Sequence, residues 1–151
     1  MPYLSVWLHL VWTTKNRFPF LKDEIRPLVF DHIRENAFRK EIFLDCVNGY
    51  LEHIHCLVSL GSQQTISKLL QLLKGESSHW INEQQLCPPK FDWQDEYFAV
   101  SVSYSQLAKI RAYIKNQENH HQHKTFEQEY EEFILHYGFG ELKPVAKRKT
   151  N

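Results

Sequence analysis

Two histidines one residue apart, His53 and His55, lie within GYLEHIHCLVSL, residues 49–60. The rest of this run consists of residues typical of a buried β-strand. Because side chains alternate along a strand, both imidazoles would point to one face, about 7 Å apart at the backbone. Two imidazoles at this spacing can converge on one metal ion. The alternative is that both histidines are satisfied by ordinary hydrogen bonds. The chain contains nine histidines, so one pair with this spacing is not rare by chance.

A second pair with the same spacing, His121 and His123 in NHHQH, serves as a control. This pair falls in a predicted helix, where residues two apart point about 200° away from each other. The two side chains therefore cannot chelate one ion together. The spacing predicts a metal site only in the strand.

A tyrosine and a glutamine, Tyr113 and Gln117, share one face of a predicted helix because they are four residues apart. A tyrosine on an amphipathic helix is typical of core packing. Gln117 is harder to explain in this way, because it continues a stripe with Ile110 and Tyr113 where leucine would be expected. A buried glutamine needs hydrogen-bond partners, and a metal ion would be one.

The charges balance, with 18 Lys and Arg against 18 Asp and Glu, which excludes a polycation that coats nucleic acid nonspecifically. Contact with DNA or RNA must come from local patches. Two are visible: Lys15 and Arg17 in TTKNR, and the tail with Lys143, Lys147, Arg148 and Lys149. Lys74, Ser77 and Ser78 in KGESSHW could bond phosphates as well. A solvated loop, a solvated helix face and a frayed terminus are the alternatives.

The composition is that of a folded protein: 42% of the 151 residues are hydrophobic and 24% are charged. The sequence contains no apolar run of about 18 residues and no signal-peptide pattern, so we expect a cytoplasmic protein without a membrane partner. The three cysteines have no C-x-x-C spacing, which favours reduced core thiols over disulfides or zinc ligands. They are Cys46, Cys56 and Cys87.

Hydrophobic periodicity predicts four strands, over residues 5–13, 41–49, 53–60 and 96–103. Asn48 and Gly49 favour a turn between the second and third strands. Helices are predicted over residues 23–38, over 66–85 with an interruption at Gly75, and over 106–124 with Ser105 as its cap. A capping box of Thr125 and Gln128 predicts a last helix, closed by Gly138.

The order β-α-β-β-α-β predicts an α+β fold of the ferredoxin-like or RRM-like type. Its antiparallel sheet would be followed by additional C-terminal helices, one of which carries Tyr113. No linker or repeat divides the chain. We therefore predict a single domain over residues 1–140 and a basic, flexible tail over residues 141–151.

Five motifs occur together and in order: HLVWTTKNR, the histidine pair around Ile54, LLKGESS, YFAVSVS, and YIKNQENHH. With them the chain resembles, from Ser5 to Gly138, the single-tyrosine HUH transposases of the IS200-like family, to which REP-associated tyrosine transposases are related. That family usually has Pro-Asp before the first histidine, where this chain has Leu51 and Glu52. Glu52 keeps the carboxylate and could orient a histidine or stay in the turn.

The resemblance implies a transposase that cleaves and rejoins single-stranded DNA, with hairpins at the element ends, through a 5'-phosphotyrosine link at Tyr113. It implies Mg²⁺ or Mn²⁺ held by His53, His55 and Gln117. It also implies a homodimer in which the tyrosine helix of one subunit completes the histidine site of the other. The candidates for phosphate contacts on the DNA are Lys15, Arg17 and Lys74.

Three alternatives stay open. The first is a non-catalytic protein that binds single-stranded nucleic acid on sheet aromatics such as Trp7, Trp12 and Phe43. The second is a domesticated descendant of a transposase. The third is a zinc hydrolase, for which the sequence offers no obvious catalytic carboxylate with a third conventional zinc ligand. The absence of a GxxxxGK[ST] stretch argues against an ATP-driven transposase.

Overall fold

The structure is a computed structural model that describes residues 2–88 and 90–136. The chain divides into two compact units, Met1–Glu118 and Asn119–Asn151, and each is described by itself. The predicted closure of the last helix at Gly138 and the predicted tail over 141–151 lie outside the described residues. The single domain over 1–140 stays a prediction.

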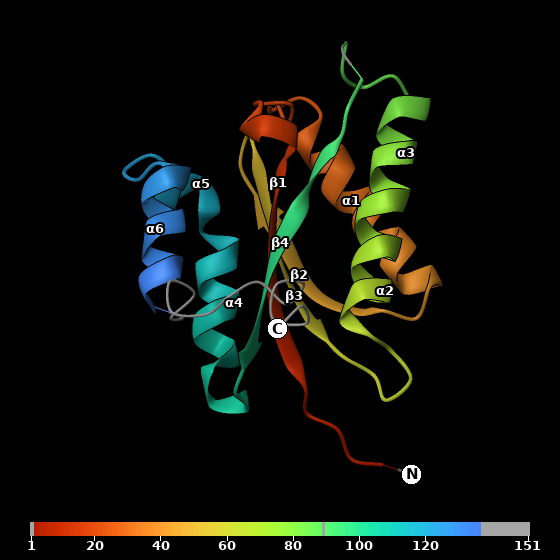
Figure 1. Cartoon of the computed structure of the whole chain (residues 1–151), viewed down its shortest axis with the longest axis vertical. Coiled ribbons are helices and arrows are strands. Elements are labelled where there is room, and N and C mark those ends of the chain that lie inside the picture. The colour runs from red at the N-terminus through yellow and green to blue at the C-terminus, as the bar shows by residue number, and fades with distance from the viewer. Residues whose placement is uncertain (1, 89, 137–151) are drawn as a thin grey trace, which may run out of the picture. The chain divides into compact units, whose positions relative to one another are not determined.

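The first unit is built on one antiparallel sheet of four strands in the order β2-β3-β1-β4 (Figure 1). The strands are β1 (Trp7–Thr14), β2 (Phe43–Gly49), β3 (His53–Ser59) and β4 (Trp93–Val102). Consecutive strands β2 and β3 form a hairpin, while β1 and β3 are neighbours joined through α1 and β2. This topology confirms the predicted α+β fold with a ferredoxin-like sheet.

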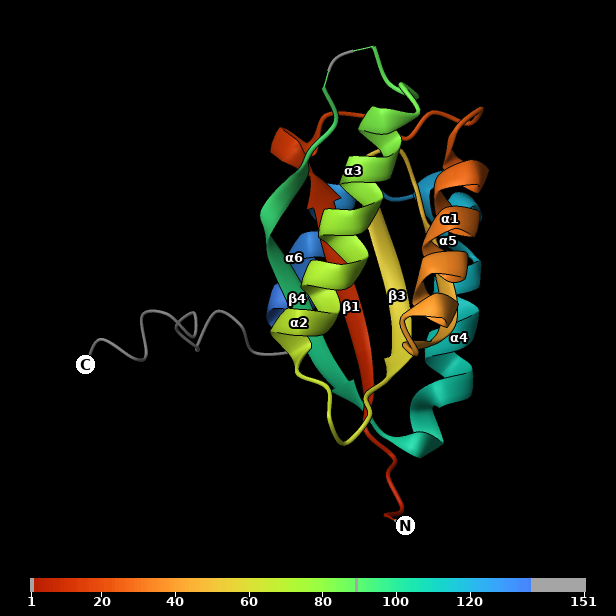
Figure 2. The same ribbon diagram turned by 90° about the vertical axis from the view of Figure 1, so that its right-hand side faces the viewer.

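One face of the sheet is covered by two helical segments that lie side by side (Figure 2). The first is α1 (Arg26–Arg39), which begins with a proline in its first turn. The second runs through α2 (Ile66–Leu70), a π-helical turn over Gln71–Gly75 and α3 (Glu76–Glu83). The α-helix is interrupted as predicted, by a π turn that ends at Gly75, although the backbone of this residue keeps helical angles of φ −61 and ψ −44.

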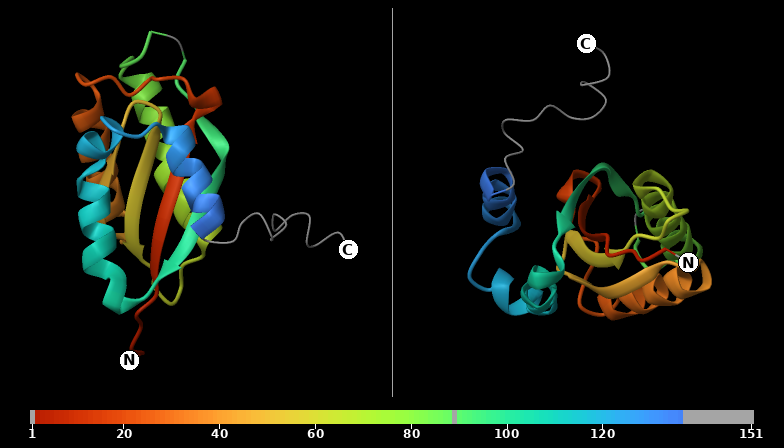
Figure 3. Two further views of the ribbon diagram at one scale, coloured as in Figure 1. Left: turned by 90° about the vertical axis from the view of Figure 1, so that its left-hand side faces the viewer. Right: turned by 90° about the horizontal axis from the view of Figure 1, so that it is seen from below.

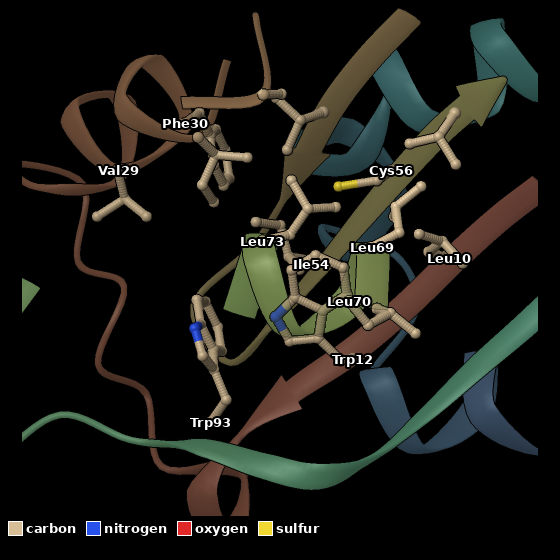
Figure 4. Close-up of a cluster of buried hydrophobic side chains, with 14 of the residues drawn as sticks. Leu10, Trp12, Val29, Phe30, Ile54, Cys56, Leu69, Leu70, Leu73 and Trp93 are labelled. Atoms are coloured by element: carbon tan, nitrogen blue, oxygen red, sulfur yellow. The ribbon is translucent and has the colours of Figure 1, made fainter. Parts of the chain in front are cut away.

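The main core fills the space between the sheet and these helices (Figure 4). Leu10, Trp12, Ile54 and Cys56 reach it from alternate positions of β1 and β3. Trp12 is only 1% exposed, so it cannot stack bases as the alternative of a nucleic-acid-binding sheet would require. The predicted burial of the thiols is confirmed for Cys46 and Cys56, whereas Cys87 is half-buried. Burial raises the pKa of Cys46 to about 11, which keeps that thiol protonated.

The other face of β2 and β3 is covered by α4 (Leu107–Lys115), which follows a 3-10 turn over Tyr104–Gln106 (Figures 1 and 3). A second apolar cluster forms there, made of Cys46, Leu57, Val102, Leu107 and Ile114. It holds the helix against the sheet, because each of these side chains is buried.

The predicted helix over residues 106–124 is wrong as a single element. It breaks at Asn116, where φ is −99 and ψ is 21, and a short helix α5 (Gln117–His121) follows. Ser105 is not its cap either, since the residue before α4 is Gln106 and Ser105 shares a hydrogen bond with the Ser103 hydroxyl at 3.2 Å.

The described part of the second unit contains the end of α5 and the helix α6 (Phe126–His136). The predicted capping box is confirmed. The Thr125 backbone N–H donates to Gln128 Oε1 at 2.9 Å, and the Gln128 N–H donates to Thr125 Oγ1 at 3.2 Å. In neither unit does a described helix have the length and apolar character needed to cross a membrane.

The predicted end of the second strand at Asn48 and Gly49 is confirmed, because β2 runs through Gly49 and the turn lies between it and His53. Asn48 is held in the strand while its side-chain amide donates to the carbonyls of Ile114 and Lys115 at 2.9 and 3.2 Å. A Cβ on Gly49 would lie 2.2 Å from the carbonyl oxygen of His53. Glycine is therefore required for the close approach of the two strands at this hairpin.

We expect Gly49→Ala to lower the free energy of unfolding by about 2 kcal/mol or more, because the backbone of β3 must move. Gly75→Ala is the matched control, since a Cβ there meets no atom within 4 Å and the backbone is helical. It should be neutral or stabilise the protein by up to about 1 kcal/mol. Urea unfolding measures the free energy of unfolding of both variants. Equal values would contradict the requirement for glycine at position 49.

Candidate active site

The imidazoles of His53 and His55 lie together on the face of β3 that α4 covers, and both are fully buried. Their ring centroids are 5.1 Å apart, and a nitrogen of one lies within 4.8 Å of a nitrogen of the other. The strand spacing thus brings both side chains to one place. A single ion could accept a lone pair from each ring.

The orientation of His53 follows from its partners. Its Nδ1 lies 2.7 Å from Glu52 Oε1, and a carboxylate only accepts, so Nδ1 carries the proton. In the neutral ring Nε2 then holds a lone pair, and it points at Gln117 Oε1 at 3.1 Å. The Gln117 amide donates its N–H to the Tyr113 carbonyl at 3.3 Å, which turns Oε1 toward His53. Two acceptor atoms facing each other are what a pair of metal ligands requires.

Glu52 therefore orients a histidine, which was one of the two roles open to it. Its own backbone is fixed, because the Thr14 N–H donates to the Glu52 carbonyl at 2.9 Å and ties the hairpin turn to the end of β1. The longer side chain of glutamate spans from this turn back to the ring of the next residue. The departure from Pro-Asp thus keeps a carboxylate on the first histidine.

His9 is a member of the site that sequence reasoning missed. It lies on β1, is 1% exposed, and places Nε2 at 2.8 Å from His55 Nδ1 with the two rings stacked. Alternation along WLHLVW would have put His9 on the face opposite Leu8 and Leu10. Only the pairing of β1 with β3, however, brings that face next to His55. When His55 Nδ1 donates this hydrogen bond, its Nε2 keeps a lone pair for a ligand.

Tyr113 lies beside these rings, with its ring centroid 5.6 Å from that of His55 and 6.2 Å from that of His9. Its helix is anchored on β2 by Arg111, which donates two hydrogen bonds of 2.8 Å to the Asp45 carboxylate. These hydrogen bonds hold the pKa of Asp45 below its usual value, so the carboxylate stays charged at neutral pH. The tyrosine is therefore held next to the histidine pair.

Gln117 is buried at the first position of α5, directly after the helix break. The next residue, Glu118, accepts a hydrogen bond of 3.0 Å from Arg26, and Arg26 also donates to the Leu21 carbonyl at 2.8 Å. This buried arginine fixes the start of α5 against the start of α1. The side chains of residues 113 and 117 thus reach the histidines from two consecutive helices.

Comparison with known proteins shows which family the chain belongs to. The family described as Transposase IS200 like matches residues 3–117 of the chain. The chain belongs to the IS200-like transposase family. Membership in a transposase family implies an enzyme that cleaves and joins DNA.

Relatives of this IS200-like transposase agree with the assignment. The chain is 28% identical over 114 residues to the ISDra2 transposase TnpA of Deinococcus radiodurans. The aligned region covers 72% of this chain and 81% of that protein. A crystal structure assigned to a transposase of Deinococcus radiodurans R1 superposes with a TM-score of 0.61 and 27% identity, covering 78% of this chain and 95% of that one. A REP-associated tyrosine transposase bound to a REP hairpin shares the fold, with a TM-score of 0.53 and 13% identity over 76% of this chain and 68% of that chain.

The three basic candidates of this IS200-like transposase lie near the start of β4. Lys15 and Arg17 are exposed in a 3-10 turn that follows β1, and the Lys15 N–H donates to the Asp92 carbonyl at 3.0 Å. Thr13, two residues before Lys15, pairs with His53, so this turn lies at the histidine end of the sheet. Lys74 donates to the carbonyls of residues 94 and 95 at 2.7 and 3.2 Å. Burial lowers its pKa.

We expect His9→Ala to weaken Mn²⁺ binding by about 10–100-fold, because the ring of His55 loses the hydrogen bond that fixes its orientation. Titration followed by Mn²⁺ paramagnetic resonance measures the dissociation constant. His79→Ala is the control, since His79 is an exposed residue of α3 paired with Glu83, and it should bind Mn²⁺ like the wild type. A folded His9→Ala variant with unchanged Mn²⁺ affinity would contradict the role of His9.

Proposed function

We propose that the protein cleaves and rejoins single-stranded DNA through a covalent 5'-phosphotyrosine link at Tyr113. The observation that carries the proposal is the pair of acceptor atoms, His53 Nε2 and Gln117 Oε1, facing each other at 3.1 Å beside this tyrosine. His55 adds a second imidazole within reach. Family membership supports DNA as the substrate.

In this mechanism the Tyr113 oxygen attacks the scissile phosphorus and forms a new P–O bond. The bond from phosphorus to the 3'-oxygen breaks, the phenol loses its proton, and the departing 3'-oxygen gains one. The phosphodiester energy is kept in the covalent link, so a 3'-hydroxyl of another strand can reverse the step. No nucleoside triphosphate is needed.

The ordinary pKa of a phenol is about 10, so the developing negative charge needs compensation at neutral pH. The donor set of the site fits a divalent cation, since His53, His55 and Gln117 would hold it and leave positions for phosphate oxygens. Mg²⁺ or Mn²⁺ bound there would act as a Lewis acid toward the phosphate. The chain itself contributes the orientation of the rings through Glu52 and His9.

We propose DNA hairpins at element ends as the recognised structure, with Lys15, Arg17 and Lys74 as phosphate contacts. A structural neighbour, the REP-associated tyrosine transposase, is bound to a REP hairpin. The basic turn with Lys15 and Arg17 lies at the same end of the sheet as His53, which supports these two residues. Lys74 already donates to two carbonyls, so its charge would act on DNA from a fixed position.

The competing role, binding of single-stranded nucleic acid on the open face of the sheet, has less support. Trp12 points into the core, and the face that carries the histidines is covered by α4. Stacking of bases does not require a glutamine oxygen aimed at an imidazole nitrogen. A zinc hydrolase is less well supported as well, because the third candidate ligand is an amide oxygen rather than a usual zinc ligand. A domesticated transposase would keep the site and lose only the mobile element.

We expect Tyr113→Phe to abolish the covalent protein–DNA adduct while leaving hairpin binding within about twofold, because one hydroxyl carries the nucleophile and little of the phosphate affinity. Arg17→Gln should do the reverse: hairpin binding weakens and loses part of its salt dependence, but the adduct still forms at saturating DNA. The readouts are a denaturant-resistant band on labelled oligonucleotides and a binding isotherm at two salt concentrations.

Tyr104→Phe is the matched control for this experiment, since Tyr104 is an exposed tyrosine before the same helix. It should form the adduct at the wild-type yield. A chelator should block the wild-type reaction, and added Mg²⁺ or Mn²⁺ should restore it. An undiminished adduct in Tyr113→Phe, or full activity in excess chelator, would refute the mechanism.

We also propose that the protein works as a homodimer with shared active sites. The described chain holds Tyr113 near its own His55, through contacts of Leu107, Ile114 and Arg111 with the sheet. These are contacts between one face of α4 and one surface of β2 and β3. The α4 helix of a second copy can make the same contacts, with the short segment before the helix crossing between the subunits.

Mixing of two inactive variants tests the shared site. His53→Ala with His55→Ala, and Tyr113→Phe, should each be inert, and refolding them together should recover DNA cleavage. In a mixed dimer with shared sites, one site combines the intact histidines with the partner's intact tyrosine. Cleavage and size-exclusion chromatography with light scattering are the measurements. An inert mixture of verified mixed dimers, or a strictly monomeric protein, would refute the sharing while leaving the chemistry intact.

A further inference from the structure

The second unit contains a buried carboxylate where an apolar residue would be expected. Along α6 the buried positions are Phe126, Glu129 and Phe133, which follow one helix face. Glu129 lies between the two phenylalanines and is 1% exposed. A buried carboxylate is costly unless it is paired or coordinates a metal ion. Its partners therefore decide what this position is for.

Two adjacent histidines of α5, His120 and His121, face this carboxylate. Their Nε2 atoms lie 3.3 and 2.8 Å from Glu129 Oε2. One potential ligand atom from each of the three residues lies within 4.8 Å of the other two. Around a tetrahedral zinc ion with bonds of about 2.0–2.1 Å, ligand atoms are separated by about 3.3 Å. The cluster is thus close to the spacing that one small ion imposes.

The tautomer of His121 also supports a metal ion at this cluster. Its Nδ1 lies 2.9 Å from the Lys124 carbonyl, which only accepts, so Nδ1 carries the proton. In the neutral ring the lone pair of Nε2 then faces an oxygen of Glu129. Two such acceptors are stabilised when a cation lies between them. A histidine whose other nitrogen donates to a backbone carbonyl is the usual arrangement of a metal ligand.

We propose that His120, His121 and Glu129 form a second metal site, which binds Zn²⁺ through two imidazoles and one carboxylate. Imidazole and carboxylate together suit a borderline first-row ion better than Mg²⁺. The family match ends at residue 117, so all three residues of this cluster lie outside the matched part of the chain. The proposal is also independent of the nucleophile assigned above.

The site has a structural purpose in the second unit. Phe126 and Phe133 are the buried apolar residues among its described positions, which is a small core for two helices. A metal ion would join the end of α5 to the middle of α6 and fix the connection between them. Binding of the ion would therefore stabilise this helical pair.

Zinc titration of the 151-residue protein tests the proposal, in a His53→Ala, His55→Ala background that removes the other histidine pair. We expect one equivalent of Zn²⁺ to bind, and Glu129→Gln or His121→Ala added to that background to weaken binding at least roughly tenfold. Cobalt should give the visible absorption of a four- or five-coordinate site. Glu131→Gln and His123→Ala are the controls, because both residues are exposed on the same segments. They should bind Zn²⁺ normally.

If the double-alanine background does not fold, stoichiometry in the native background decides. The wild type should bind two equivalents of Co²⁺, and Glu129→Gln one. Absence of saturable Zn²⁺ binding in the folded double variant would overturn the proposal. Equal metal binding by Glu129→Gln and Glu131→Gln would overturn it as well, and would leave the cluster as a proton-bridged ion pair. Neither result changes the expected behaviour of Tyr113→Phe.

Discussion

The site depends on the burial of β3 on both of its faces. On one face Ile54 and Cys56 pack into the main core, and on the other His53 and His55 lie under α4. A buried imidazole has two nitrogens that need a polar partner. A nitrogen left without one lowers the stability of the folded protein by about 1–3 kcal/mol. Burial thus requires polar partners on the histidine face, and those partners set the direction of each ring.

The partners come from three separate parts of the chain. Glu52 comes from the hairpin turn and His9 from the neighbouring strand, and each is hydrogen-bonded to an imidazole. Gln117 comes from the helix after the break and places its side-chain oxygen at the remaining nitrogen of His53. The break itself has a physical cause. The side-chain amide of Asn48 donates hydrogen bonds to the carbonyls of Ile114 and Lys115 at the end of α4. The helix therefore ends where a residue of β2 can cap it. One strand residue therefore ends the tyrosine helix and allows Gln117 to start the next one.

Much of this could be predicted from local sequence. Alternation in β3 assigned Ile54 to the core and His53 to the opposite face, and the pattern of elements was sufficient for the sheet. What could not be predicted depends on contacts between distant segments. His9 needs the pairing of β1 with β3, and the end of α4 needs an amide from β2. Trp12 looked like a surface aromatic because strand composition alone does not say which face is covered.

Gly75 and Gly49 show what local sequence and packing each contribute to the backbone. Glycine within a helical pattern predicts an interruption, and the α-helix is interrupted by a π turn that ends at Gly75, where the backbone stays helical. Glycine at the end of the second strand predicts the turn that follows, and Gly49 is required there because only hydrogen fits against the His53 carbonyl. In both cases the position follows from local sequence, while the geometry depends on the neighbouring elements.

Glu52 shows how a departure from a family pattern can leave the chemistry intact. Aspartate in that position would have a shorter reach to the ring of the next residue. Here the turn backbone is held to β1 by the Thr14 N–H, and the carboxylate of the longer side chain still lies 2.7 Å from His53 Nδ1. The function requires an acceptor at Nδ1 so that Nε2 faces inward, rather than a particular residue that supplies it. The constraint is therefore on the position of one oxygen atom, and the hairpin geometry and the side-chain length can vary together to meet it.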